Sequence, residues 1–299
     1  VSFIHRHANN PFFLYVAYNA PHAPLEAPET DIAPFAGNGK FNRGVSVLYA
    51  MIKRMDAGIG RIRESLEKNG LLENTIILFT SDNGPWLGME SGHDMTRYNG
   101  PFRGQKQDVL EGGIRVPAIV HWPAGIDGGK DVSAMVHFCD WCPTLLTACA
   151  LEPESADGFD QIEALRGNND NADSRRFWQF NRYEPIQKCN SAMRDGDWKL
   201  YWPRIPEAMK KTVEDGAWYR RMFTEPHFEM PLPDPHFINR ENCKPGKPEL
   251  YNLKDDPCEN VNLSEKYPGK LEKMKKELEN WFETVDGERR QLPEYSGSN

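Results

Sequence analysis

Three short segments carry side chains that could bind a metal ion and a tetrahedral anion. They hold a histidine between prolines, His22, an adjacent Asp82 and Asn83 before a glycine, and Lys106 in a glycine-containing loop. Hard cations such as Ca²⁺ and Mg²⁺ bind carboxylate and amide oxygens. A lysine ammonium is a compact charge that suits an oxyanion. Together the segments indicate one site for a cation and an anion.

Each segment also has an ordinary structural interpretation. His22 could simply end a strand, an Asp-Asn-Gly sequence is common in turns, and most lysines are solvated surface groups. The flanking prolines restrict the backbone around His22, which favours a presented imidazole that could contact an anion or protonate a leaving oxygen. Asp82 and Asn83 are too few for Ca²⁺, which takes about 6–8 oxygens, so further ligands are expected elsewhere.

The elements before these residues are predicted to bring two of them together. The continuous apolar run 11–18 predicts a strand buried on both faces, and 75–80 predicts a second one. Apolar residues at three- and four-residue steps predict a helix over 46–69 between them. Strand, helix, strand is typical of a parallel crossover. His22 and Asp82 would then follow carboxyl ends at one sheet edge, where open α/β sheets bind ligands.

The middle of the chain continues this pattern and then breaks. Residues 116–122 predict a third strand, and 138–150 predict a helix. The polar, Asn/Asp-rich stretch 167–174 is typical of a boundary. We therefore expect a first domain over 1–170 and a second over 171–299.

The last part has a different character. Residues 198–202 and 249–253 predict strands of a smaller antiparallel sheet, and 268–284 predict a helix with one apolar face. Between the strands, the long Pro- and aromatic-rich segment 203–248 is a candidate to shape a substrate pocket, because loops of that length are often functional.

The composition limits the class of protein. The 299 residues are 39% hydrophobic and 11% aromatic, which argues against disorder. The net charge is −8 and no long basic run occurs, so nucleic acid is not an expected partner. No apolar run has the length of a membrane span. The sequence predicts no oligomeric state.

The cysteines leave two alternatives open. Cys139 and Cys142 form a C-x-x-C, which could bind zinc or do redox chemistry, but no second pair with ligand spacing follows. Buried structural thiols are the favoured interpretation. One disulfide among Cys189, Cys243 and Cys258 would suit an oxidising compartment.

Several stretches together resemble the sulfatase family, within the alkaline-phosphatase-like superfamily. In family order they are NAPHAP, TIILFTSDNG, PFRGQKQDVLEGGIRVPAIVHWP, DWCPTLL, AMRDGDWKL and ELYNLKDDPCENVNL. The resemblance implies an α/β fold: part of an alkaline-phosphatase-like sheet flanked by helices, and a smaller C-terminal domain with an antiparallel sheet and a helix. It also implies hydrolysis of a sulfate ester of an aryl or carbohydrate compound.

The resemblance implies a role for each candidate residue. Asp82 and Asn83 would ligate Ca²⁺, with Mg²⁺ less favoured. His22 would contact the sulfate or the leaving oxygen, and Lys106 would hold a sulfate oxygen. The partner would be a sulfated small molecule or glycan.

One feature of the family is missing. No Cys or Ser begins the C/S-x-P-x-R motif that yields the nucleophilic formylglycine, and the paired N-terminal aspartates have no counterpart. The chain also begins at Val1 rather than Met. We expect it to be the C-terminal part of a periplasmic or secreted sulfatase, with little activity alone. The alternatives are a phosphatase or phosphonate monoester hydrolase with a Thr or Ser nucleophile, and a non-catalytic truncated relative.

Overall fold

The computed structural model describes residues 1–37, 39–90, 92–152, 157–168, 175–225, 227 and 243–292. Contacts between residues divide the chain into two compact units. The first unit comprises Val1–Asp82, Trp86–Tyr98 and Val116–Ala172. The second comprises Asn83–Pro85, Asn99–Arg115 and Asp173–Asn299. The second unit therefore includes two short pieces from the first half of the sequence, one of which carries Lys106.

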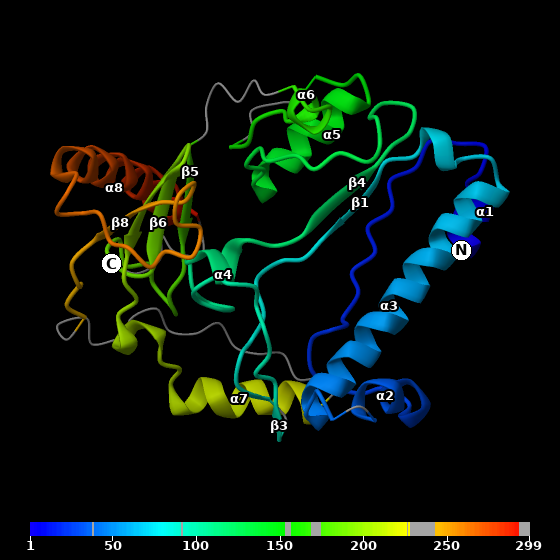
Figure 1. Ribbon diagram of the computed structural model, residues 1–299, viewed down its shortest axis with the longest axis horizontal. Coiled ribbons are helices and arrows are strands. Elements are labelled where there is room, and N and C mark those ends of the chain that lie inside the picture. The colour runs from blue at the N-terminus through cyan, green and yellow to red at the C-terminus, as the bar shows by residue number, and fades with distance from the viewer. Residues whose placement is uncertain are drawn as a thin grey trace. The chain divides into compact units, whose positions relative to one another are not determined.

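The first unit combines helices with short antiparallel strand pairs (Figure 1). Its elements in chain order are α1 (Ser2–Arg6), α2 (Glu29–Ala36), α3 (Arg43–Lys68), η1 (Leu72–Asn74), β1 (Ile77–Thr80), β2 (Met89–Glu90), β3 (His93–Asp94), β4 (Ala118–His121), η2 (Phe138–Asp140), α5 (Trp141–Ala148) and α6 (Ile162–Leu165).

Helix α3 lies where the apolar periodicity predicts a helix, but begins three residues earlier, at Arg43. Asn42 causes the earlier start, because its side-chain oxygen accepts a hydrogen bond from Val45 N at 2.9 Å and caps the helix. The helix ends at Lys68, and Gly70 follows with φ of 68°, the left-handed conformation that glycine adopts readily. The helix prediction is confirmed.

The predicted parallel crossover is wrong. Strand β1 pairs with β4, and the pair is antiparallel, with Ile77 opposite His121 and Thr80 opposite Ala118. Residues 11–18 form no strand, and Phe13 and Tyr15 are 78% and 80% exposed. A strand needs a neighbour that pairs with its backbone, and the apolar run has none among the described residues.

The second unit is built on a four-stranded antiparallel sheet. Its strands are β5 (Arg176–Gln179), β6 (Ser191–Asp195), β7 (Trp198–Trp202) and β8 (Glu249–Asn252), in that spatial order. The other elements of this unit are α4 (Glu111–Ile114), η3 (Pro206–Met209), α7 (Val213–Thr224) and α8 (Pro268–Arg290). The predicted antiparallel sheet and C-terminal helix are confirmed, and the helix extends beyond residue 284.

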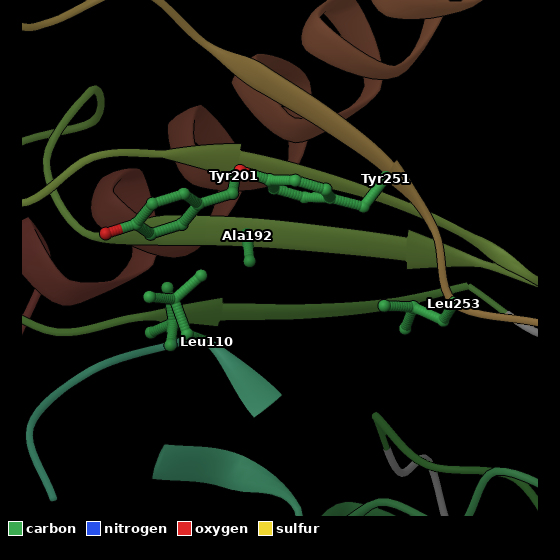
Figure 2. Packing of buried hydrophobic residues seen from close by; sticks show 6 residues of the cluster. Leu110, Ala192, Tyr201, Tyr251 and Leu253 are labelled. Carbon is green, nitrogen blue, oxygen red and sulfur yellow. The ribbon is translucent and has the colours of Figure 1, made fainter. Parts of the chain in front are cut away.

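Alternation along the strands gives this sheet two buried faces. Alternate residues of β6, β7 and β8 contact helix α8 on one face, in a cluster that contains Met193, Leu200, Leu250, Met274 and Leu278. The strand residues between them, Ala192, Tyr201 and Tyr251, belong to the opposite cluster, which also contains Leu253, Val109 and Leu110. Figure 2 shows Leu110 below the strands that carry Ala192 and Tyr201. The segment that follows Lys106 thus covers one face of the sheet.

Other sequence expectations have mixed outcomes. All six cysteines lie in described regions, and no disulfide joins any of them. Part of the segment expected to shape a pocket, residues 226 and 228–242, lies outside the described residues. Of the helices that are described, none is long and apolar enough to cross a membrane. The α/β fold class itself is confirmed.

Candidate active site

His22 lies in a turn of the first unit. Its backbone N donates to Asn19 O at 2.8 Å, and its Nδ1 lies 2.9 Å from Ala23 O. The side chain is exposed. The local hydrogen bond fixes one ring nitrogen near the backbone, and Nε2 is the atom that could face a substrate. The sheet-edge argument that placed His22 beside Asp82 does not hold, because residues 11–18 form no strand.

Asp82 and Asn83 follow the end of β1, as predicted. The Asp82 side chain is exposed, and Asn83 is half-buried with its Nδ2 donating to Gly84 O at 2.8 Å. Gly84 is required at the next position, because a Cβ there would lie 1.9 Å from Gly112 O. The glycine lets the Asp-Asn-Gly turn approach another segment of backbone.

The Asn83–Pro85 piece is joined directly to the Asn99–Arg115 piece, the Lys106 loop, within the second unit. Gly84 N donates to Gly113 O, and Lys106 N donates to Pro85 O, both at 2.8 Å. Asn83 and Lys106, 23 positions apart in sequence, therefore lie on segments that share two backbone hydrogen bonds. Two of the four predicted site residues are brought together in this way.

The Lys106 loop is a tight structure. Gly104 has φ of 85°, and Gln107 has φ of 77°, which is uncommon for a residue with a side chain. A Cβ on Gly113 would lie 2.0 Å from Asp108 O. Lys106 itself is half-buried. The glycine spacing that the sequence showed around this lysine thus reflects close packing of backbone on backbone.

Asp108 fixes the loop on one side of Lys106. Its Oδ2 accepts from Gln105 N at 3.1 Å, and its Oδ1 accepts from an Arg204 guanidinium nitrogen at 3.0 Å. The Asp108 side chain is only 9% exposed. A mostly buried carboxylate with a charged donor and a backbone donor is well satisfied, so this contact orders the loop.

A buried charge cluster lies where the loop meets the sheet. Lys199 Nζ donates to Glu111 Oε1 at 2.9 Å and lies 2.8 Å from Glu259 Oε1, the latter an ion pair without hydrogen-bond alignment. The side chains of Lys199 and Glu259 are 0% exposed. Glu259 Oε2 also accepts from Glu111 N at 2.7 Å. Burial raises the pKa of Glu259, although Lys199 opposes the shift.

The sequence predictions gave no role to Asp108, Lys199, Glu111 or Glu259. A signal was present for Lys199, which is the one charged residue in the strand-like run Trp198–Trp202. A charge at an inward position of such a strand indicates a buried partner. Its partners could not be inferred, because Glu111 is 88 positions away.

The candidate metal ligands among the described residues are too few to bind calcium by themselves. Asp82 and Asn83 are two ligand side chains with at most three oxygens between them, against the ~6–8 oxygens that Ca²⁺ takes. Within the part of the chain that the structure describes, no group of three or more His, Cys, Asp or Glu side chains could hold a metal ion. No such group includes the Cys139 and Cys142 pair among the described residues. The prediction that both are buried thiols is wrong for Cys142, which is exposed, and Cys139 is half-buried.

Known proteins are similar to this chain in sequence and in fold. The Sulfatase family model matches residues 1–150. Arylsulfatase J of Mus musculus is 29% identical over 92% of this chain and 46% of its own length. N-acetylgalactosamine-6-sulfatase of Homo sapiens is 34% identical over 55% of this chain and 30% of its own length.

A solved structure has a fold similar to that of this chain. The crystal structure of Ps i-CgsB in complex with k-i-k-neocarrahexaose superposes with a TM-score of 0.70 and 26% identity, over 99% of this chain and 58% of that one. The chain therefore spans about half the length of the proteins it matches. Because the family model covers half of the residues, and the relatives agree with it, this chain belongs to the sulfatase family.

Proposed function

We propose that the protein containing this chain is a sulfuric ester hydrolase that cleaves a sulfate ester of an aryl or carbohydrate compound. Family membership supports the reaction class. The names of the relatives support the substrate class, since one is an arylsulfatase, one is named for a sulfated amino sugar, and one was solved with a carrahexaose. A periplasmic or secreted location is part of the same proposal.

One observation from this chain supports the proposal most directly. The segment with the proposed metal ligand Asn83 and the loop with the proposed anion-binding Lys106 share two backbone hydrogen bonds. A cation ligand and an ammonium group on adjoining segments suit a substrate whose head group carries negative charge on several oxygens, as a sulfate ester does. An ordinary turn and an ordinary surface lysine need no such connection.

The chain's own residues would act as follows. Lys106 would place its positive charge against the non-bridging oxygens of the sulfate and stabilise the charge that develops there. His22 would donate a proton to the bridging oxygen as the alcohol departs. The exposed His22 ring, with Nδ1 near Ala23 O, leaves Nε2 as the proton donor.

The cation and the nucleophile complete the proposal. Asp82 and Asn83 would hold Ca²⁺, in preference to Mg²⁺, together with ligands from the part of the relatives that this chain does not span. The formylglycine nucleophile would come from that same part. Since the residues present here complete neither group, we assign no catalytic step to either.

The test compares the 299-residue chain with a chain extended to the length of its relatives. We expect turnover of 4-nitrophenyl sulfate by the longer protein and none by the shorter one. In the longer protein, Lys106→Ala and His22→Ala should each lower kcat by about 10²–10⁴-fold. Lys254→Ala, which changes an exposed lysine of the same unit, is the matched control and should leave kcat unchanged.

The rival functions predict other results. Faster turnover of 4-nitrophenyl phosphate or of a phosphonate monoester than of the sulfate would favour the phosphatase alternative. No turnover of any ester by the longer protein would favour the non-catalytic relative. Turnover by the 299-residue chain, abolished in His22→Ala, would show that the nucleophile lies within it.

A further inference from the structure

Asn190 joins the Lys106 loop to the C-terminal sheet. It precedes strand β6 and is 0% exposed, with φ of 45°. Its side chain makes three hydrogen bonds, all to backbone: Nδ2 donates to Gln107 O at 2.7 Å and to Phe180 O at 2.8 Å, and Oδ1 accepts from Val109 N at 3.2 Å. Two of the three bonds are to the loop that carries Lys106.

This pattern requires an asparagine. The side chain must donate twice and accept once, which an amide does and a carboxylate cannot. Aspartate has the same shape but would face two carbonyl oxygens with acceptors only. The backbone of Asn190 is held as well, because its N donates to Pro203 O and its O accepts from Phe180 N. The hydrogen bonds of its backbone and side chain therefore hold the Asn190 amide in one position.

The bonds from Asn190 act beside Lys106. Asn190 holds the carbonyl of Gln107, the residue with the unusual φ of 77°, and Asp108 holds the N–H of Gln105. Lys106 lies between Gln105 and Gln107 in the sequence, and its own backbone N donates to Pro85 O. The backbone on both sides of the lysine is thus tied to side chains that have no contact with a substrate in the proposed function.

We propose that Asn190 is a positioning residue for Lys106: it holds the loop in the conformation from which the ammonium reaches the sulfate oxygens. The inference rests on the proposed function of Lys106. It assigns a task to the C-terminal sheet, which would preorganise an anion-binding group carried by another part of the sequence.

Hydrogen exchange of single amides tests the positioning in the 299-residue chain. The variants are Asn190→Ala, the isosteric Asn190→Asp, and Leu278→Ala, whose side chain contacts the opposite face of the sheet. The Leu200 amide of β7 serves as the reference for global opening. In both Asn190 variants we expect exchange at Lys106 to accelerate by about tenfold or more beyond the change at Leu200.

The control separates positioning from general loss of stability. Leu278→Ala should change exchange at Lys106 and Leu200 by the same factor. If Asn190→Ala is too unstable to measure, Asn190→Asp keeps the side-chain volume and carries the test. Equal acceleration at the two amides in the Asn190 variants, or a Lys106-specific effect in Leu278→Ala, would overturn the inference and leave the proposed function standing.

Titration with inorganic sulfate, followed by the backbone amide resonances of residues 105–107, which every variant retains, tests the function separately. Asn190→Asp should weaken sulfate binding by about tenfold, Leu278→Ala should not, and Lys106→Met should abolish it. A parent chain whose Lys106 does not respond to sulfate would contradict the proposed role of the lysine. Unchanged sulfate affinity in a folded Asn190→Asp would contradict the positioning role.

Discussion

Lys199 illustrates how one buried residue can join two parts of a sequence. It pairs with Glu111 from the loop and with Glu259 from the segment after β8, with no solvent exposure of its own side chain. One ammonium faces two carboxylates, and Arg115 lies 3.6 Å from Glu111 Oε2 as a second cation. Glu259 is fully buried, which disfavours its charged form. The raised pKa of Glu259, caused by burial, is the expected response.

Removal of the ammonium should be costly. Lys199→Met would leave Glu259 buried without its ammonium partner and Glu111 with only Arg115, at 3.6 Å, and we expect the free energy of unfolding to fall by about 3–5 kcal/mol at pH 8. Urea denaturation measures the change. Lys273→Met, at an exposed α8 lysine 3.7 Å from Glu277, should cost no more than about 1 kcal/mol, and an equal loss in both variants would contradict the proposed importance of the cluster.

The same cluster sets a direction for pH dependence. A carboxyl group whose pKa is raised by folding binds its proton more tightly in the folded state than in the unfolded one. Its stabilising contribution is complete below pH 4.5, the ordinary value, and is lost as pH rises through the folded pKa. Glu259→Gln should therefore make stability less dependent on pH above 4.5, as urea midpoints at pH 5 and 8 would reveal.

Tyr201 predicts an alkaline effect. Burial raises the pKa of Tyr201 from 10.0 to about 12. The unfolded chain then loses this proton first, so stability should fall as pH rises from 10 to 12, by roughly 2–3 kcal/mol. Tyr201→Phe has no proton to lose and should show a smaller fall. Equal slopes for parent and variant over that range would contradict the assignment.

At the scale of elements, Gly112 of α4 and Gly287 of α8 differ in the space around them. A Cβ on Gly112 would lie 2.4 Å from both Arg103 O and Gly104 O, which are backbone atoms that cannot move away easily. Gly287, in α8, has no atom within 4 Å of the position a Cβ would take. The two glycines therefore serve opposite purposes.

An alanine at each position should show this difference. Gly112→Ala should destabilise the protein by at least about 1–3 kcal/mol, because the loop must shift. Gly287→Ala should stabilise it by about 0.5–1 kcal/mol, because alanine is the better helix former. Thermal unfolding of both variants measures the signs, and stabilisation by Gly112→Ala would mean that the loop packs less tightly than described.

Elements with strong local patterns could be predicted from the sequence. Helices α3 and α8 and strands β1, β4, β7 and β8 all lie within predicted ranges or overlap them. Residues 11–18 have an equally apolar pattern but form no strand, because pairing depends on a neighbour and not on the segment itself. The sequence singled out the segment around Lys106. It could not show that Asn190 binds this segment, because the hydrogen bond joins residues 83 positions apart.

At the scale of the molecule, the sequence predicted a boundary near residue 170, and the extent of the functional domains stays a prediction. The division by contacts is less simple than a single cut, because Asn83–Pro85 and Asn99–Arg115 belong with the C-terminal sheet. Long-range contacts of this kind follow from tertiary packing, which local composition does not encode.

Calcium binding provides a test at this scale. With only two ligand side chains at Asp82 and Asn83, and no larger ligand group among the described residues, the 299-residue chain should bind Ca²⁺ no more tightly than about 10⁻³ M. Isothermal titration calorimetry of the purified chain measures this. Micromolar affinity, lost in Asp82→Asn, would reveal ligands beyond the described residues.

The packing of Leu110 and Val109 on the sheet has a consequence for protein engineering. Residues 99–115 and the sheet share a hydrophobic cluster, a buried ion pair and the Asn190 amide. A chimera between two sulfatases that joined the loop of one parent to the sheet of the other would mismatch all three contacts at once. Recombination should succeed only where both segments are inherited from a single parent.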